Sequence, residues 1–94
     1  MTERESLINQ IKLLSNDLDK LYADKVSFRN HCYLRIAYDN TCGNKWDLIV
    51  EKPFIKNATL LQLSTSLDYL IKYKNNFVTV MSDNDLSLQY RKKL

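Results

Sequence analysis

The fold is decided by residues 28–46, which read FRNHCYLRIAYDNTCGNKW. This stretch contains the only histidine, the only glycine and the only tryptophan of the 94-residue chain, and both of its cysteines. The segment before it has the pattern of a long helix, and the segment after it has the pattern of shorter amphipathic elements. The architecture therefore depends on whether this stretch is itself helical or extended.

A helix and a β-hairpin both fit the stretch. In a helix, Arg35 and Asp39 would pair one turn apart. Asn30 would cap the N-terminus of this helix, and Gly43 would lie just beyond its C-terminus. In a hairpin, alternating apolar residues would form two strands over about 32–50.

Glycine and proline are scarce in this chain. It has one of each, whereas average usage is about 7% glycine and about 5% proline. Few turn-forming residues predict few turns and long elements. We therefore predict a mainly α fold, with a long N-terminal coiled-coil-like helix and two or three shorter helices. The alternative is an α+β fold with a hairpin at about 32–50.

An apolar seam marks the N-terminal helix. Thr2 is placed to cap this helix, and apolar residues then recur at spacings of four, three, four and three. Such a seam can pack on its own domain or on a second copy, and both alternatives are open. We predict one domain over residues 1–94, with an oligomerisation helix at 1–29 and a compact helical part at 30–94. The predicted interface residues are Leu7, Ile11, Leu14, Leu18 and Leu21.

The middle of the chain contains a clear helix start. Pro53 ends the connector before it, in which residues 48–50 could be extended. Thr59 and Gln62 have the spacing of a capping box. They predict a helix that reaches about Lys74.

The last part of the chain predicts one more helix after a short break. Residues 77–81 are rich in β-branched and aromatic side chains, which favours a short extended segment. Ser82 and Asp85 have capping-box spacing and predict the start of the final helix.

Composition argues against several classes of protein. The net charge is +3 without a dense stripe of lysine and arginine, which argues against nucleic-acid binding. The apolar runs are only a few residues long, so no membrane span is predicted. No secretory signal pattern opens the sequence, and we expect a cytoplasmic protein with reduced thiols.

Few residues could carry chemistry. The soft metal-ligand candidates are His31, Cys32 and Cys42, and their spacing matches no common zinc site. We therefore predict no metal and no cofactor. A nucleophile pair of His31 with a cysteine is an enzymatic alternative, although adjacent residues such as His31 and Cys32 point in different directions.

Arg35 is the centre of the predicted ligand site. A guanidinium among aromatic rings can stack on a base and can bind a phosphate or carboxylate with two donors. The same arginine could instead be structural and pair with Asp39 or Asp47. We predict ligand binding and no catalytic residue at a site formed by Arg35, Tyr38, Lys45 and Trp46.

Three short strings within residues 28–60 resemble a labelled group of proteins. They are His31-Cys32-Tyr33-Leu34-Arg35-Ile36-Ala37, Lys45-Trp46-Asp47 and Pro53-Phe54. These strings resemble short bacterial and phage-type reading frames that are often labelled GCN5-related acetyltransferases. The label implies acetyl-CoA binding through an Arg/Gln-x-x-Gly-x-Gly/Ala loop at a helix N-terminus. The single glycine, Gly43, has no such pattern around it, so no catalytic or cofactor residue carries over.

Together these patterns predict a small oligomeric binding protein without enzymatic activity. Its expected partner is another protein or a small anionic ligand such as a nucleotide. The size and style of the chain also fit a phage-type modulator of a host enzyme. The alternative is a small acyltransferase-like or hydrolytic enzyme that uses His31.

Overall fold

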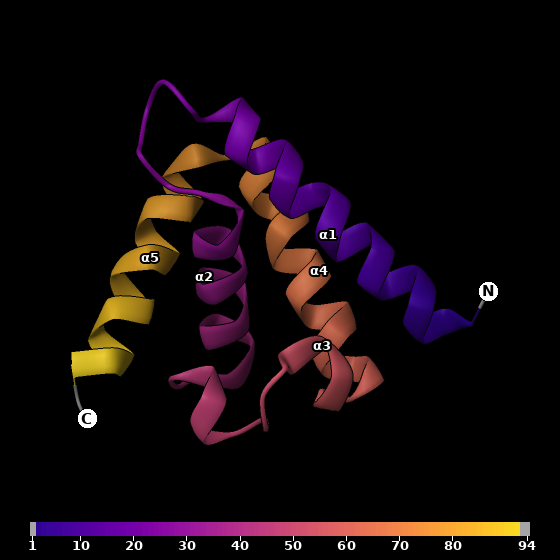
Figure 1. Cartoon of the computed structure of the whole chain (residues 1–94). Coiled ribbons are helices and arrows are strands. Elements are labelled where there is room, and N and C mark those ends of the chain that lie inside the picture. Colours follow the sequence, from indigo (N-terminus) through magenta and orange to yellow (C-terminus); the bar gives the residue numbers. More distant parts are fainter. Residues whose placement is uncertain (1, 93–94) are drawn as a thin grey trace.

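Five α-helices and one short 3₁₀-helix make up the computed structural model, which describes residues 2–92 (Figure 1). No strand occurs within these residues. The predicted mainly α class is therefore confirmed, and the alternative hairpin at about 32–50 is wrong. The elements are α1 (Glu3–Leu21), α2 (Asn30–Cys42), η1 (Trp46–Leu48), α3 (Phe54–Asn57), α4 (Leu60–Asn75) and α5 (Phe77–Lys92).

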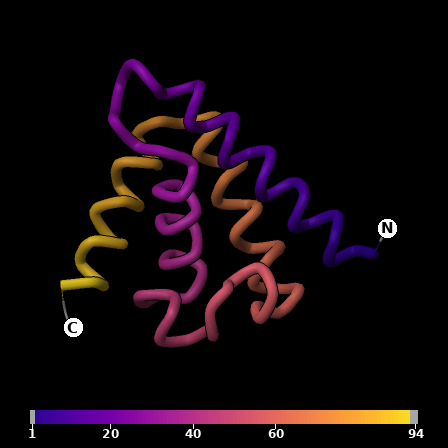
Figure 2. Tube along the Cα trace, viewed as in Figure 1, coloured from indigo at the N-terminus to yellow at the C-terminus, as the bar shows by residue number. Residues whose placement is uncertain are grey.

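Helix α2 lies between α5 on one side and α1 with α4 on the other (Figures 1 and 2). This central position explains why buried residues occupy most of its circumference, including Tyr33, Ile36 and Ala37 at 0% exposure. The helix starts one residue earlier than predicted, because the capping position is Arg29 and not Asn30. Gly43 follows it with a φ of 64°, the left-handed conformation that glycine adopts most easily at a helix end.

Helix α1 begins as the sequence predicts. The Thr2 side chain accepts a hydrogen bond from the backbone N–H of Glu5. The apolar seam of α1 faces α2 and α4 of the same chain, so that Ile11 and Leu18 are fully buried. This burial makes α1 part of the core of the domain.

Hydrogen bonds at both ends hold α1 beside α4. Near the start of α4, the two terminal nitrogens of Arg4 donate to the carbonyl oxygens of Ala58 and Ile55, each at 2.8 Å. Near the end of α4, the hydroxyl of Tyr22 donates to the carbonyl oxygen of Tyr73 at 2.6 Å. The two helices therefore run in the same direction.

The connector between α2 and α4 is folded into short turns. Residues 48–50 are not extended, because Leu48 ends η1 and residues 49–50 form a turn and a bend. The side-chain amide of Asn57 donates to the carbonyl oxygens of Glu51 and Lys52 at 3.0 and 3.1 Å. These bonds close the connector on itself and place its aromatic residues against α2.

The capping box that begins α4 is confirmed. The Thr59 side chain accepts from the backbone N–H of Gln62, and the Gln62 side chain accepts from the backbone N–H of Thr59. The buried face of α4 is not entirely apolar. It includes Ser66, which is fully buried and whose hydroxyl forms a hydrogen bond with the hydroxyl of Thr41 in α2. The helix ends at Asn75, close to the predicted end at Lys74.

The predicted break at residues 77–81 is wrong, and so is the helix start at Ser82. Helix α5 begins at Phe77, directly after Asn76, whose side-chain oxygen accepts from the backbone N–H of Thr79. Its buried positions are Val80, Asn84 and Ser87, which have the spacing of a helix. Two of these three buried residues are polar. The hydrophobic pattern of the sequence therefore does not show the helical period of α5.

Candidate binding pocket

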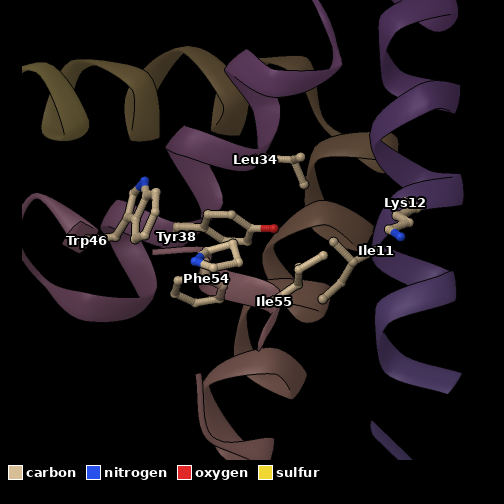
Figure 3. Close-up of a pocket in the computed structure, with 8 residues that line it drawn as sticks. Ile11, Lys12, Leu34, Tyr38, Trp46, Phe54 and Ile55 are labelled. Atoms are coloured by element: carbon tan, nitrogen blue, oxygen red, sulfur yellow. The ribbon is translucent and has the colours of Figure 1, made fainter. Parts of the chain in front are cut away.

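An apolar cavity of about 230 Å³, open to the surface on one side, lies between α1, α2 and the connector that carries η1 and α3 (Figure 3). Each of these three segments supplies part of the wall. The lining residues are Ile11, Lys12, Leu34, Tyr38, Trp46, Pro53, Phe54 and Ile55.

Three aromatic rings form one side of the cavity. The rings of Tyr38 and Phe54 are stacked, with centroids 3.8 Å apart and planes 13° from parallel. The Trp46 ring meets both rings edge to face, at centroid distances of 5.8 Å and 5.6 Å. Both contact types are favourable arrangements of aromatic rings. They fix the Tyr38 ring so that its hydroxyl end points away from Trp46 (Figure 3).

The Tyr38 hydroxyl is a polar group directed into an apolar space. Its oxygen points toward the space between Leu34, Ile55 and Ile11 (Figure 3). Tyr38 is 5% exposed, and no group within residues 2–92 forms a hydrogen bond with its hydroxyl. Burial raises the pKa of Tyr38 to about 12, so the hydroxyl stays protonated at neutral pH. It is therefore an available hydrogen-bond donor.

Lys12 contributes to the α1 side of the cavity wall. Its side chain is exposed, and no ion pair is formed by Lys12 in the part of the chain that the structure describes. The lysines of the nearby connector differ in this respect. The ammonium nitrogens of Lys45 and Lys52 lie 3.7 and 3.4 Å from the carboxylate of Asp47, which partly neutralises both.

A second polar arrangement lies on the other side of α2 and centres on Asp39. Asp39 is fully buried and accepts hydrogen bonds from the backbone N–H of Trp46 at 2.9 Å and the hydroxyl of Ser87 at 2.6 Å. Arg91 donates to the same carboxylate from Nε at 2.9 Å and from Nη2 at 3.2 Å. This carboxylate joins α2, η1 and α5, and its hydrogen-bonding capacity is largely filled.

Arg35 belongs to this arrangement and not to the cavity. Its terminal nitrogens donate to the hydroxyl of Ser87 at 2.7 Å and to the side-chain oxygen of Asn84 at 2.8 Å. Burial and the neighbouring Arg91 lower the pKa of Arg35. The hydrogen-bond partners of Arg35 are thus the neutral side chains of Asn84 and Ser87 in α5. The sequence had suggested an ion pair with Asp39 or Asp47 instead.

The structure divides the four residues of the predicted ligand site. Tyr38 and Trp46 lie together on the cavity wall, Arg35 faces α5, and Lys45 pairs with Asp47. Sequence reasoning missed the contributions of α1, above all Lys12, and of the Phe54–Ile55 turn. The seam pattern placed Ile11 at a packing surface, but nothing in the sequence indicated that Lys12 would face the connector.

The residues of the enzymatic alternative lie outside the cavity. His31 is exposed, while Cys32 and Cys42 are half-buried free thiols. Burial, together with the charge of Asp39, raises the pKa of the Cys42 thiol. Within residues 2–92, no three histidine, cysteine or acidic side chains cluster closely enough to hold a metal ion.

The predicted interface residues of α1 have different environments. Ile11 and Leu18 are fully buried by their own chain, and Leu7 and Leu14 pack partly against the core. Leu21 is 48% exposed. With this fold, a second copy could not contact Ile11 or Leu18, while self-association through other surfaces stays a prediction.

No protein-family model matches the chain, and no curated protein or solved structure is detectably similar to it. The resemblance to reading frames labelled as acetyltransferases therefore stays an expectation. None of the helices in residues 2–92 is long and apolar enough to cross a membrane.

Proposed function

We propose that this protein is a non-catalytic binding protein whose cavity between α1, α2 and the connector takes up an apolar ligand group. The observation that carries the proposal is the apolar lining of the cavity, into which the Tyr38 hydroxyl points as a hydrogen-bond donor without a partner in residues 2–92. A ligand that accepts a hydrogen bond from this hydroxyl would gain about 0.5–1.5 kcal/mol from it.

The size of the cavity limits what it can hold. A volume of about 230 Å³ is below the roughly 300–1,000 Å³ of most ligand pockets. A small molecule fits this volume, and so does one end of a longer molecule. The walls are hydrocarbon and aromatic, so burial of apolar surface would supply most of the binding free energy.

The lining chemistry supports binding and not catalysis. Apart from Tyr38 and Lys12, every lining side chain is apolar. No carboxylate, thiol or imidazole is among the lining residues that could act as a base or nucleophile. The predicted nucleotide ligand is less well supported, because Arg35 and Lys45 are engaged elsewhere.

The proposal is tested with 1-octanol as a neutral probe that has an apolar chain and one hydrogen-bonding group. Trp46 is the only tryptophan and lines the cavity, so its fluorescence reports occupancy directly. We expect a saturable change with one site per chain.

Two leucine variants locate the site. Leu34→Phe fills part of the cavity and should abolish saturable binding, whereas Leu61→Phe adds the same bulk at a residue that is 76% exposed and should change nothing. Absence of saturable binding to the wild-type protein, or binding that survives Leu34→Phe in a folded variant, would contradict the proposal.

A further inference from the structure

We infer that α4 and α5 can join into one continuous helix, and that a second copy of this chain then supplies the α5 that packs against α2. The two copies exchange their C-terminal helices in a symmetric dimer. The partner is an identical chain, and the surface that it occupies is the side of α2 that faces α5. This inference is independent of the apolar cavity and of the ligand proposed for it.

A single residue separates α4 from α5. Helix α4 ends at Asn75 and α5 begins at Phe77, so only Asn76 lies between them, with an extended backbone at φ −154° and ψ 104°. The one glycine and the one proline of the chain both lie before residue 60. Neither of the two strongest helix-breaking residues therefore prevents a helix over residues 60–92.

The inward faces of α4 and α5 share one helical phase. Buried and partly buried positions recur from one helix to the other at alternating spacings of three and four, without a shift at Asn76. These positions are Leu63, Ser66, Leu70, Tyr73, Phe77, Val80, Asn84, Ser87 and Arg91. Two separate helices need no common phase, whereas a continuous helix needs it to present a single inward stripe. The sequence of this region therefore fits the straight form as well as the bent one.

Side chains cap the backbone at the bend. The hydroxyl of Tyr22 donates to the carbonyl oxygen of Tyr73 at 2.6 Å, and the side-chain oxygen of Asn76 accepts from the backbone N–H of Thr79 at 3.3 Å. In a continuous helix, the first three backbone N–H groups of α5 would instead bond to the last three carbonyl oxygens of α4. The backbone bonds gained on straightening thus offset the side-chain caps that are lost.

A straightened α5 cannot stay on its own α2. A continuous helix over residues 60–92 would be roughly 50 Å long, whereas the longest dimension of the domain is 35 Å. In the bent form, α5 turns back and lies beside α2 (Figure 1). In the straight form it would project beyond the domain and leave that side of α2 uncovered.

The uncovered side of α2 would need a replacement for α5. Asp39 would lose Ser87 and Arg91 as donors, and Arg35 would lose Asn84 and Ser87 as acceptors. A carboxylate that is shielded from water and has lost its cationic partner is costly. The α5 of a second copy carries the same groups at the same spacing, so it can re-form each of these bonds between chains.

The experiment uses two substitutions of Val78, whose side chain is 74% exposed in the first turn of α5. Proline is tolerated in the first turn of a helix and breaks a helix interior. Val78→Pro therefore allows the bent form and blocks the continuous helix, whereas Val78→Ala removes the same side chain and allows both. Each protein is refolded from urea at about 1 mM, the effective concentration that a short linker provides, and its mass is measured by light scattering.

We expect a dimer fraction for the wild-type protein and for Val78→Ala, and a folded monomer for Val78→Pro. A second pair of variants tests the bend directly. Asn76→Ala and Asn76→Gly both lose the cap on Thr79, but alanine is the better helix former, so the alanine variant should dimerise about fivefold more tightly.

An isotope-filtered NMR experiment on a mixture of labelled and unlabelled chains identifies the exchange. Nuclear Overhauser contacts between Arg35 of one chain and Ser87 of the other are expected in the dimer. A wild-type protein that stays monomeric at about 1 mM would overturn the inference. So would a dimer in which these contacts lie within one chain, or equal dimerisation of Val78→Pro and Val78→Ala. If Val78→Pro does not fold, equal dimerisation of the two Asn76 variants would overturn it.

Discussion

The fully buried carboxylate of Asp39 lies 2.9 Å from the Nε atom of Arg91, so that an ion pair links the last turn of α2 to the last turn of α5. The ion pair is supported by the hydroxyl of Ser87, which donates to the same carboxylate. A buried charge is tolerated only when it is paired and hydrogen-bonded. This arrangement therefore determines how α5 packs on the rest of the protein.

Removal of the buried carboxylate should destabilise the fold strongly. Asp39→Ala leaves Arg91, Ser87 and the backbone N–H of Trp46 without their shared acceptor. We expect a loss of about 3 kcal/mol in the free energy of unfolding, as for other broken buried pairs. Urea denaturation measures it, with Asp85→Ala at an exposed position of α5 as the control. Equal stability of the two variants would refute the structural role of Asp39.

Arg35 should matter for stability and not for ligand binding. Arg35→Lys keeps the positive charge but loses the planar group that reaches both Asn84 and Ser87. We expect a loss of about 1–2 kcal/mol in the free energy of unfolding and an unchanged affinity for 1-octanol. A variant with wild-type Tm and weakened ligand binding would instead restore Arg35 to the ligand site that the sequence predicted.

Two adjacent leucines of α1 separate core packing from self-association. Leu14 packs partly against the core, whereas Leu13 is 64% exposed. Leu14→Glu should lower the free energy of unfolding by roughly 2 kcal/mol or more, and Leu13→Glu should change it by at most about 0.5 kcal/mol.

Light scattering on the same two variants tests assembly. If the exposed side of α1 mediates self-association, Leu13→Glu should lower the molecular mass without a loss of stability. A Leu14→Glu variant with wild-type stability and a lower mass would show that the seam faces a second copy and not the core.

Buried tyrosines should make the protein sensitive to alkaline pH. Burial raises the pKa of Tyr33 and of Tyr38 to about 12, from an ordinary value of 10.0. Burial and the hydrogen bond to Asp83 also raise the pKa of Tyr73. The folded state disfavours ionisation of these phenols, so their contribution to stability is complete below about pH 10 and is lost as the pH rises toward 12.

Unfolding by urea at a series of pH values measures this effect. The free energy of unfolding should fall above about pH 10, and less steeply in Tyr33→Phe. The Tyr33 hydroxyl is buried and has no hydrogen-bond partner among residues 2–92, so this variant should lose little or no stability at neutral pH. A free energy of unfolding that stays constant up to pH 12 would contradict these pKa shifts.

Local capping signals made the fold class and two helix starts predictable from the sequence. Thr2 and the Thr59–Gln62 box act as short-range signals, and Gly43 marks the end of α2 through its own backbone conformation. The error at residues 77–81 has a tertiary cause. Asn84 and Ser87 occupy the buried face of α5 because they bind Arg35, and no local pattern reveals that partner.

The candidate site was predictable only in part for a similar reason. Tyr38 and Trp46 lie in one stretch with a strong aromatic pattern, and the structure places them on one cavity wall. Lys12 and Ile55 join them through the packing of α1 against the connector, which the Arg4 hydrogen bonds to Ile55 and Ala58 fix. The spacing of residues along the sequence does not predict contacts between segments that lie so far apart in the chain.

The most direct test of the central claim is an NMR measurement of contacts between bound 1-octanol and the protein. We predict nuclear Overhauser contacts from the octanol chain to the methyl groups of Leu34 and Ile55 and to the ring of Tyr38, with the Trp46 indole resonance shifted on binding. Contacts only to exposed leucines such as Leu61, or no contacts at all, would contradict the account.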